Sequence, residues 1–353
     1  MSQRGEWGRR ALLAALGVLV AAAVLEAGVR LLGLAPELEP IVLDEPYASF
    51  VSSDNPLLRY VPRAGSGDIN GYGIRDRDYE IAKAADTFRV LVIGDSIAFG
   101  YCNPRESLAI PHTFPKVLER ELGATPPAAS ARVEVINLGV SGYNTIQEVE
   151  FLRQKGLALE PDLVVVAYSL NDSRDHSREL NAFRRHGQWS VLRAWQTSAS
   201  RSALSNSHLL RLLWYRLALL REGGRTPGTP SATTDARELG FERLRGLGER
   251  AGFDALVAIF PNFDDFEHYP HRAEHRETRR AAAEAGFGVL DLLPLFREAS
   301  SGRSNALKGR CSSNHPNERG HALAGHSLAG FIREAYAARS PGGAPSWGTP
   351  PAS

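Results

Sequence analysis

Four short segments, far apart in the sequence, contain residue types that together could cleave an ester bond. They contribute a serine, a glycine, an asparagine and a histidine, namely Ser96, Gly139, Asn171 and His315. A serine hydroxyl becomes an effective nucleophile only when a base takes its proton and donors stabilise the oxyanion that forms. In this pattern Ser96 would attack a carbonyl carbon, and His315 would take the proton and later return it to the leaving group.

The predicted oxyanion donors are the backbone N–H groups of Ser96 and Gly139 and the side-chain amide of Asn171. Gly139 suits this role because, without a Cβ, its N–H can approach a reacting centre closely. Each segment alone has a simpler interpretation, since Ser96 could cap a helix and Asn171 could belong to a turn. The order of the four segments, and the position of three of them directly after predicted strands, favour a catalytic site.

Alternating apolar strands and helices must bring these residues together. Buried strands are predicted from continuous apolar or β-branched runs at Phe88–Ile93, Val133–Asn137, Asp162–Tyr168, Ala255–Phe260 and Val289–Leu292. Stretches such as His112–Leu122 and Thr145–Lys155 predict helices between them. This alternation is typical of a parallel sheet with helices on both faces. Ser96, Gly139 and Asn171 would then lie at its carboxyl edge, where open α/β sheets bind ligands.

The four segments resemble those of the SGNH hydrolases, also called GDSL-type esterases and lipases, over roughly residues 70–335. The matching residues are Gly94-Asp95-Ser96, Gly139 in NLGVSGYN, Asn171 in SLND and His315 in HPNERGH. The resemblance implies a flavodoxin-like, three-layer α/β/α domain with a mostly parallel five-stranded sheet. It also implies that Ser96 is the nucleophile, that His315 is the base, and that Gly139 and Asn171 donate to the oxyanion.

One departure from the family pattern concerns the residue that orients the catalytic histidine. The family usually has an aspartate three residues before this histidine, and Ser312 occupies that position here. In a serine protease triad, a neutral residue in place of the aspartate costs about 10⁴-fold in rate. Ser312 and Asp291 are the two candidates to accept the imidazole N–H, and a Ser–His dyad is the alternative.

Two cysteines lie close in sequence to the predicted catalytic pair, Cys102 after Ser96 and Cys311 before His315. If Ser96 and His315 meet, the two sulfur atoms could be near enough to form a disulfide in an exported protein. Two free thiols are the alternative.

Other patterns give no support to cofactor, metal or nucleic-acid chemistry. The segment 94–100 is not GxGxxG, no GK[ST] follows it, and no CxxC pair is present. His268, His271 and His275 lie close in sequence without an HExxH motif, so we interpret them as a solvated helix face and its neighbouring loop. The net charge of +1 does not indicate a nucleic-acid partner. We therefore expect no cofactor and no metal ion.

The N-terminal segment predicts export. Arginines precede a long apolar run that starts at Ala11 and is interrupted only by Glu26 and Arg30 before it ends at Leu34. This run is long enough to cross a bilayer, which needs about 20 residues. Positive charge before it predicts a cytoplasmic N-terminus and an exported remainder.

A cleaved signal peptide with its cleavage site at Ala21-Ala22-Ala23 is the alternative, and it would make the protein secreted. The stretch Asn70–Arg75 (NGYGIR) also resembles the segment that precedes the catalytic domain in exported, membrane-anchored bacterial members of the family.

Composition along the chain predicts four parts. These are a membrane anchor or signal segment at 1–34, a linker at 35–62, the hydrolase domain at 63–339 and a disordered tail at 340–353. An insertion at about 173–240 interrupts the strand–helix alternation and includes a predicted amphipathic helix at His208–Leu220. Long insertions are often lids, so this one could cap the site.

The sequence therefore predicts an exported, membrane-anchored serine esterase that cleaves or transfers small O-acyl groups. The expected substrate is an acetylated carbohydrate or a related small ester, and this expectation rests on compartment and family analogy alone. A lipid esterase is one alternative. A catalytically degenerate protein that binds or scaffolds components of the cell envelope is another.

Overall fold

The computed structural model describes residues 3–35, 49–55, 57–100, 107–127, 132–173, 206–221, 235–310, 315–339 and 345–347. The chain separates into two compact units. The first comprises Met1–Ile41, Ser53–Arg59 and His186–Thr229, and the second comprises Val42–Ser52, Tyr60–Arg185 and Pro230–Ser353.

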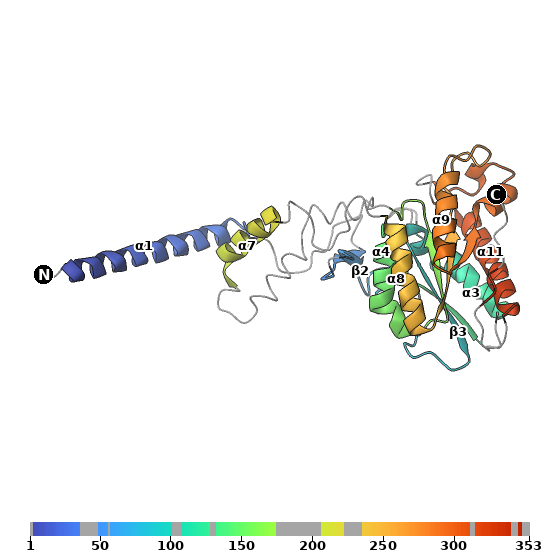
Figure 1. The fold of residues 1–353 in the computed structure, drawn as a ribbon, viewed down its shortest axis with the longest axis horizontal. Coiled ribbons are helices and arrows are strands. Elements are labelled where there is room, and N and C mark those ends of the chain that lie inside the picture. The colour runs from blue at the N-terminus through green and yellow to red at the C-terminus, as the bar shows by residue number, and fades with distance from the viewer. Residues whose placement is uncertain are drawn as a thin grey trace. The chain divides into compact units, whose positions relative to one another are not determined.

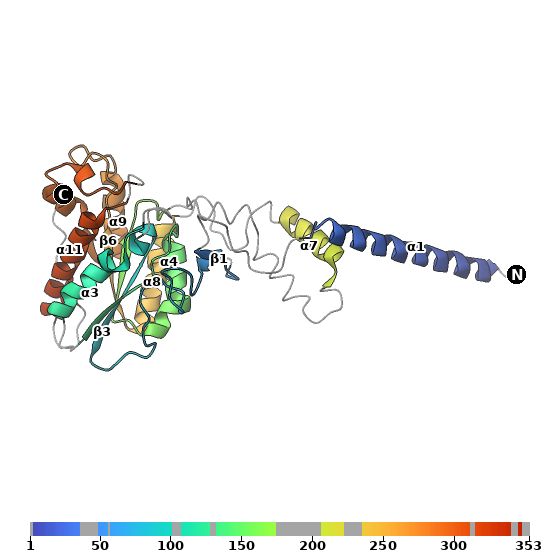
Figure 2. The same ribbon diagram turned by 180° about the vertical axis from the view of Figure 1, so that it is seen from behind.

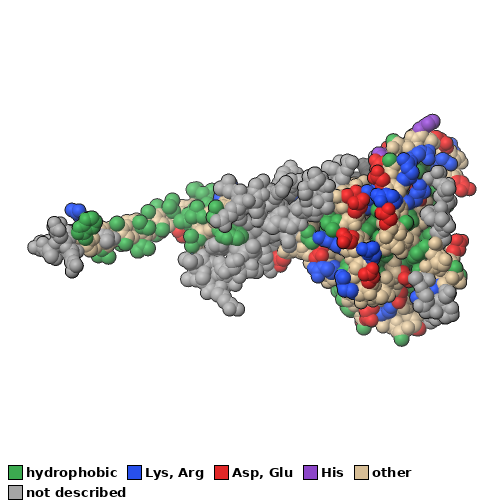
Figure 3. All heavy atoms as spheres, viewed as in Figure 1, with side chains coloured by type: hydrophobic (Ala, Val, Ile, Leu, Met, Phe, Trp, Pro, Cys, Tyr) green, Lys and Arg blue, Asp and Glu red, His purple; other side chains and the backbone are tan. Residues whose placement is uncertain are grey.

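In the first unit, helix α1 (Gln3–Leu31) contacts helix α7 (His208–Arg221) (Figure 1). Hydrophobic side chains lie exposed along α1 (Figure 3). The stretch Trp7–Leu31 of α1 is long and apolar enough to cross a membrane, a property that signal sequences share.

A parallel sheet forms the centre of the second unit. Its strands are β3 (Thr87–Gly94), β4 (Arg132–Asn137), β5 (Leu163–Tyr168), β6 (Asp254–Ile259) and β7 (Gly288–Asp291). They lie in the order β4-β3-β5-β6-β7, and every neighbouring pair is parallel. This arrangement confirms the predicted five-stranded α/β fold. The strand boundaries agree with the sequence prediction to within a residue, because each strand contains a run of buried apolar side chains.

Helices cover both faces of the sheet and complete three layers (Figures 1 and 2). One layer contains α4 (Thr145–Phe151), α8 (Ala236–Ala251) and α9 (Arg272–Glu284). The other contains α3 (Phe114–Ala124), α10 (Leu293–Ala299) and α11 (Glu318–Ala337). Alternate side chains of the central strands, such as Val90 and Val92, join the core beneath the second layer.

Smaller elements complete the second unit. Strands β1 (Phe50–Ser52) and β2 (Tyr60–Pro62) form an antiparallel pair. The short helices are α2 (Ser96–Phe99), η1 (Ile110–His112), η2 (Leu152–Gly156), η3 (Leu157–Leu159) and η5 (Ser304–Ala306).

Two predicted helices have different ends from those expected. The helix predicted from His112 begins instead at Phe114, because Ile110–His112 forms a separate 3₁₀ turn. The helix predicted over Thr145–Lys155 remains α-helical to Phe151 and then continues as a π turn.

Candidate active site

Ser96 lies at the carboxyl end of β3, between the neighbouring strands β4 and β5. Asp95 caps the short helix α2, because its Oδ1 accepts the N–H of Ile97 at 2.8 Å. Gly100 ends this helix in the left-handed conformation, with φ of 73°. A side chain at Gly94 would lie 2.9 Å from the Cβ atoms of Ala98 and Ala167, so only glycine allows this tight turn.

His315 lies beside Ser96, with Nε2 2.7 Å from the Ser96 Oγ. This is hydrogen-bond distance, as a nucleophile and its general base require. The backbone around His315 is fixed, because its carbonyl accepts the N–H of Gly309 at 2.7 Å. Immediately afterwards, Asn317 caps α11 by accepting the N–H of Gly320 at 3.1 Å. Burial lowers the pKa of His315 to about 4, so the imidazole is neutral at pH 7 and can accept a proton.

Two polar contacts orient the amide of Asn171 at the end of β5. Its Nδ2 donates to Asp95 Oδ2 at 3.2 Å, and its Oδ1 accepts the hydroxyl hydrogen of Ser169. A primary amide carries two N–H donors. One of them binds Asp95, and the other can therefore donate to an oxyanion next to Ser96.

The Gly139 backbone N–H, in contrast, already donates a hydrogen bond within the protein. Its N–H donates to Asn137 Oδ1 at 2.9 Å, which conflicts with the predicted role as an oxyanion donor. The absence of a Cβ has a packing reason, since a side chain there would lie 2.6 Å from the Phe99 nitrogen. Gly142 follows in the same loop, is partly exposed and has φ of 80°. Its N–H makes no hydrogen bond to another residue that the structure describes.

A cluster of three buried carboxyl groups, Asp95, Glu148 and Asp172, adjoins Asn171. Burial raises the pKa of all three, and the negative charges of the neighbouring members raise those of Glu148 and Asp172 further. Within the described residues, both Glu148 carboxyl oxygens lack a hydrogen-bond partner. The cluster therefore favours protonated carboxyl groups next to the candidate oxyanion donor. The sequence pattern does not reveal this cluster, because Glu148 lies on a helix, where a carboxylate is normally solvated.

Arg75 supports the other end of α2. Its Nη1 donates to the Phe99 carbonyl at 2.7 Å, and its Nη2 donates to the Leu108 carbonyl at 2.6 Å and to Asp68 at 2.9 Å. The guanidinium thus holds together two backbone segments that border the site. This contact gives a structural reason for the Asn70–Arg75 motif, which the sequence suggested only by resemblance.

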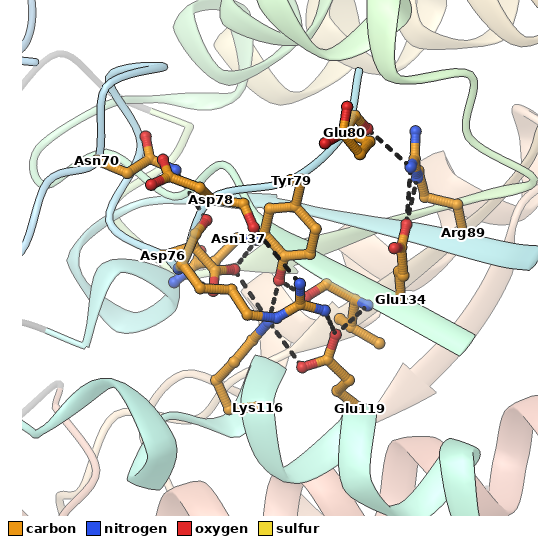
Figure 4. A network of polar contacts seen from close by, with 12 residues as sticks. Asn70, Asp76, Asp78, Tyr79, Glu80, Arg89, Lys116, Glu119, Glu134 and Asn137 are labelled. Carbon is orange, nitrogen blue, oxygen red and sulfur yellow. Dashed lines mark hydrogen bonds and ion pairs between the residues drawn. The ribbon is translucent and has the colours of Figure 1, made fainter. Parts of the chain in front are cut away.

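A neighbouring polar network fixes the same helix through Asn137 (Figure 4). Asp76 accepts the Asn137 backbone N–H at 2.9 Å, and the Asn137 Nδ2 donates to the Ala98 carbonyl at 2.7 Å. Lys116 pairs with Asp76 at 3.0 Å and also contacts Tyr79 at 2.6 Å and Glu119 at 3.1 Å. Charged side chains of α3 therefore position the backbone around Ser96 without contacting Ser96 itself.

Ser96 and His315 open into a cavity of about 250 Å³. Leu108, Pro316 and His321 are among the other residues that line it. His321 is oriented by the backbone N–H of Phe114, which donates to its Nδ1 at 3.1 Å. Burial lowers the pKa of His321 to about 3, with smaller contributions from His315 and Arg75. The cavity is therefore lined by two histidines that are both neutral at pH 7.

Asp291 does not serve as the orienting residue for His315. Its Oδ1 is 2.8 Å from His275 Nδ1 and accepts the N–H of Leu293 at 3.1 Å. It lies on β7, three positions across the sheet from β3, which corresponds to about 14 Å at the usual strand spacing. The other candidate orienter, Ser312, lies outside the described residues, as do both members of the predicted disulfide, Cys102 and Cys311.

The interpretation of the clustered histidines as solvated is wrong for His275, which is buried, and each of the three lies near its own aspartate. His268 lies 3.0 Å from Asp265, His271 lies 3.2 Å from Asp264, and His275 pairs with Asp291. Among the described residues, no group of three His, Cys, Asp or Glu side chains is arranged to hold a metal ion.

The three-layer fold, with a serine, a histidine and an asparagine at one edge of a parallel sheet, defines an α/β/α enzyme that hydrolyses ester bonds. The chain belongs to the GDSL-like lipase/acylhydrolase family, whose model matches residues 92–323. This match confirms the resemblance to the SGNH hydrolases.

Several solved structures are similar to the chain. An α/β hydrolase from the metagenome of Lake Arreo, Spain, is 16% identical with a TM-score of 0.44, covering 71% of this chain and 97% of its own. An acetylxylan esterase from Geobacillus stearothermophilus is 17% identical with a TM-score of 0.42, covering 69% and 94%. A lipase/acylhydrolase from Enterococcus faecalis is 16% identical with a TM-score of 0.41, covering 70% and 95%. No curated protein matches the chain.

Proposed function

We propose that the chain is a membrane-anchored serine esterase that cleaves or transfers short acyl groups on the exported side of a membrane. The observation that carries the catalytic part is the 2.7 Å contact between Ser96 Oγ and His315 Nε2 at the surface of the cavity. Membership of the GDSL-like family supports the ester bond as the target.

In the proposed reaction, His315 Nε2 accepts the Ser96 hydroxyl proton as Oγ attacks the ester carbonyl carbon. The oxyanion of the tetrahedral intermediate accepts hydrogen bonds from the Ser96 N–H, the Asn171 Nδ2 and the Gly142 N–H. The intermediate collapses when the His315 imidazolium gives its proton to the leaving alkoxide. Water or an acceptor alcohol, deprotonated by His315, then attacks the carbonyl carbon of the acyl-serine. The bond between this carbon and Ser96 Oγ breaks as His315 returns the proton to Oγ, which releases the acid or the new ester.

The size of the cavity supports a short acyl group. Its volume of about 250 Å³ is below the range of about 300–1,000 Å³ that is typical of sites for drug-sized ligands. A short acyl group fits within this volume. The proposed substrate class is therefore a small acyl ester or an acylated glycan, as the sequence analysis expected.

The exposed apolar surface of α1 supports anchoring. A bilayer would cover the side chains that the rest of the first unit leaves exposed. Three arginines before the apolar stretch favour a cytoplasmic N-terminus and an exported catalytic unit.

Labelling with a fluorophosphonate tests the nucleophile and the base together. The full chain in detergent should form one adduct, which mass spectrometry should locate on Ser96. Ser96→Ala and His315→Ala should both abolish the adduct. Ser107→Ala removes another serine that lines the cavity, and His326→Ala removes an exposed histidine, so both matched controls should label normally.

An adduct elsewhere, or an adduct that survives His315→Ala, would refute the proposed nucleophile–base pair. If folded protein formed no adduct at all, the binding or scaffold alternative would gain support. With an established adduct, hydrolysis rates on p-nitrophenyl esters of increasing chain length would test the substrate. A preference for long chains would favour the lipid esterase instead.

A further inference from the structure

Glu26 is an unusual residue for a membrane anchor. It lies within the Trp7–Leu31 stretch of α1, where most apolar side chains are exposed. A carboxylate in or near the hydrocarbon region of a bilayer is costly unless other groups neutralise it and donate hydrogen bonds to it. Glu26 therefore needs partners.

Helix α7 and its preceding residue supply three of those partners. Glu26 accepts the backbone N–H groups of His208 and Leu209, at 2.9 and 2.8 Å, and the hydroxyl of Ser207 at 2.9 Å. Arg30, one turn along α1, donates to Glu26 at 2.6 Å and to the Asn206 carbonyl at 2.8 Å. The carboxylate of one helix thus caps the positively polarised N-terminus of the other, and this contact ties α7 to the anchor.

The composition of α7 points to a lipid surface. Its sequence HLLRLLWYRLALLR contains three arginines and no acidic residue, and Trp214 lies near its centre. Leu213 and Leu217, one helical turn apart, are 56% and 46% exposed. With 14 residues, α7 is about 21 Å long, too short to cross a hydrocarbon core of about 30 Å. Basic, leucine-rich helices of this kind lie in the plane of the lipid–water interface.

We propose that α7 is a second membrane-contacting element, which lies in the headgroup region of an anionic phospholipid bilayer and is held to the anchor by Glu26. This inference rests on the membrane anchoring proposed above. Leu213 and Leu217 face the acyl chains and continue the apolar surface of α1. Arg216, which is exposed on α7, interacts with lipid phosphates, because an anionic surface attracts basic residues that lie near it.

A photoactivatable phospholipid tests the contact directly. The full chain is reconstituted in nanodiscs of phosphatidylethanolamine and phosphatidylglycerol that contain a diazirine-bearing phospholipid. After irradiation, mass spectrometry locates the adducts. The proposal predicts adducts both on α1 and on the Leu209–Leu217 part of α7. Glu26→Ala should reduce the α7 adducts at least fivefold and leave the α1 adducts unchanged.

The double variant Leu213→Asp/Leu217→Asp should also reduce the α7 adducts. A matched control is Ile81→Asp in the second unit, where Ile81 is 41% exposed, and this variant should change neither set of adducts. Fluorophosphonate labelling of each variant shows whether the catalytic unit remains folded and active.

The outcomes separate this proposal from the anchoring on which it rests. Adducts on α1 without adducts on α7 would overturn the proposal for α7 and leave the anchor intact. An absence of adducts on both helices would overturn the anchoring itself. Unchanged α7 adducts in Glu26→Ala would overturn the role of Glu26.

Discussion

His275 and His315 in the second unit each lie within hydrogen-bond distance of a hydroxyl group, but their other surroundings differ. His275 is buried, with Asp291 2.8 Å from Nδ1 and the Tyr269 hydroxyl 3.1 Å from Nε2. His315 has the Ser96 hydroxyl 2.7 Å from Nε2 and lines a cavity. A carboxylate–histidine–hydroxyl series is therefore present in this chain, but away from the serine.

Position in the sheet explains the difference. Asp291 ends the edge strand β7, and its partners join α9, the loop before α9 and the start of α10 into one buried cluster. Ser96 follows β3, which has a strand on each side, so donors from two neighbouring strand ends can reach the same point. Among the described residues, strand position and access to a cavity distinguish the candidate catalytic histidine, His315, from His275.

The largest expected difference between the two clusters is in rate. Ser96→Ala and His315→Ala should each lower kcat/KM on p-nitrophenyl acetate by at least about 10⁴-fold, because neither group of a nucleophile–base pair works alone. His275→Gln should leave kcat/KM near the wild-type value. It should instead lower Tm, since an unpaired buried polar group costs about 1–3 kcal/mol. A large rate loss in folded His275→Gln would show that His275 also takes part in catalysis.

The oxyanion donors should give the next largest effect. Asn171→Ala should lower kcat by about 10²–10³-fold with little change in KM, because the amide acts on the transition state. Asn262→Ala is the matched control in the His275 cluster, where the Asn262 backbone N–H, which the substitution keeps, donates to the Tyr269 hydroxyl at 2.9 Å. An Asn171→Ala effect confined to KM would indicate substrate binding instead.

The dependence of rate on pH should follow the burial of His315. Only the neutral imidazole accepts the serine proton, and burial lowers its pKa to about 4 from an ordinary value of 6.5. The rate constant kcat/KM should therefore stay level as the pH falls from 7 to 5. It should then drop about tenfold per pH unit below 4. A decline that begins near pH 6.5 would show that His315 is solvated in the free enzyme.

Continuous apolar runs made the sheet predictable, and the convergence of strand ends made Ser96, Gly139 and Asn171 candidates from the sequence alone. His315 became a candidate through its HPNERGH segment, which resembles the histidine segment of the family. Sequence pattern could not distinguish Gly139 from Gly142, because both are glycines in one loop. Only the Asn137 side chain shows that the Gly139 N–H is occupied. The hydrogen bonds from α7 to Glu26 and the burial of Glu148 were equally inaccessible, since both depend on contacts between distant segments.

The smallest expected change in kcat/KM comes from introducing a carboxylate near His315, like the one that lies beside His275. Ser312→Asp places a carboxylate at the position where the family usually has one, while Asp291→Asn removes the carboxylate that His275 has. A nearby negative charge stabilises imidazolium, so Ser312→Asp should move the acid limb of the pH profile upward by about 1–3 units. It should also raise kcat/KM at pH 7 by less than about 10²-fold.

Asp291→Asn should leave both the pH profile and the rate at pH 7 unchanged and should lower Tm. An unchanged acid limb in folded Ser312→Asp would mean that His315 already has an effective orienting partner. In that case the absence of an aspartate at position 312 would not lower the rate. The two histidines would then differ in their hydroxyl partner and in access to the cavity, and both imidazole rings would be equally well oriented.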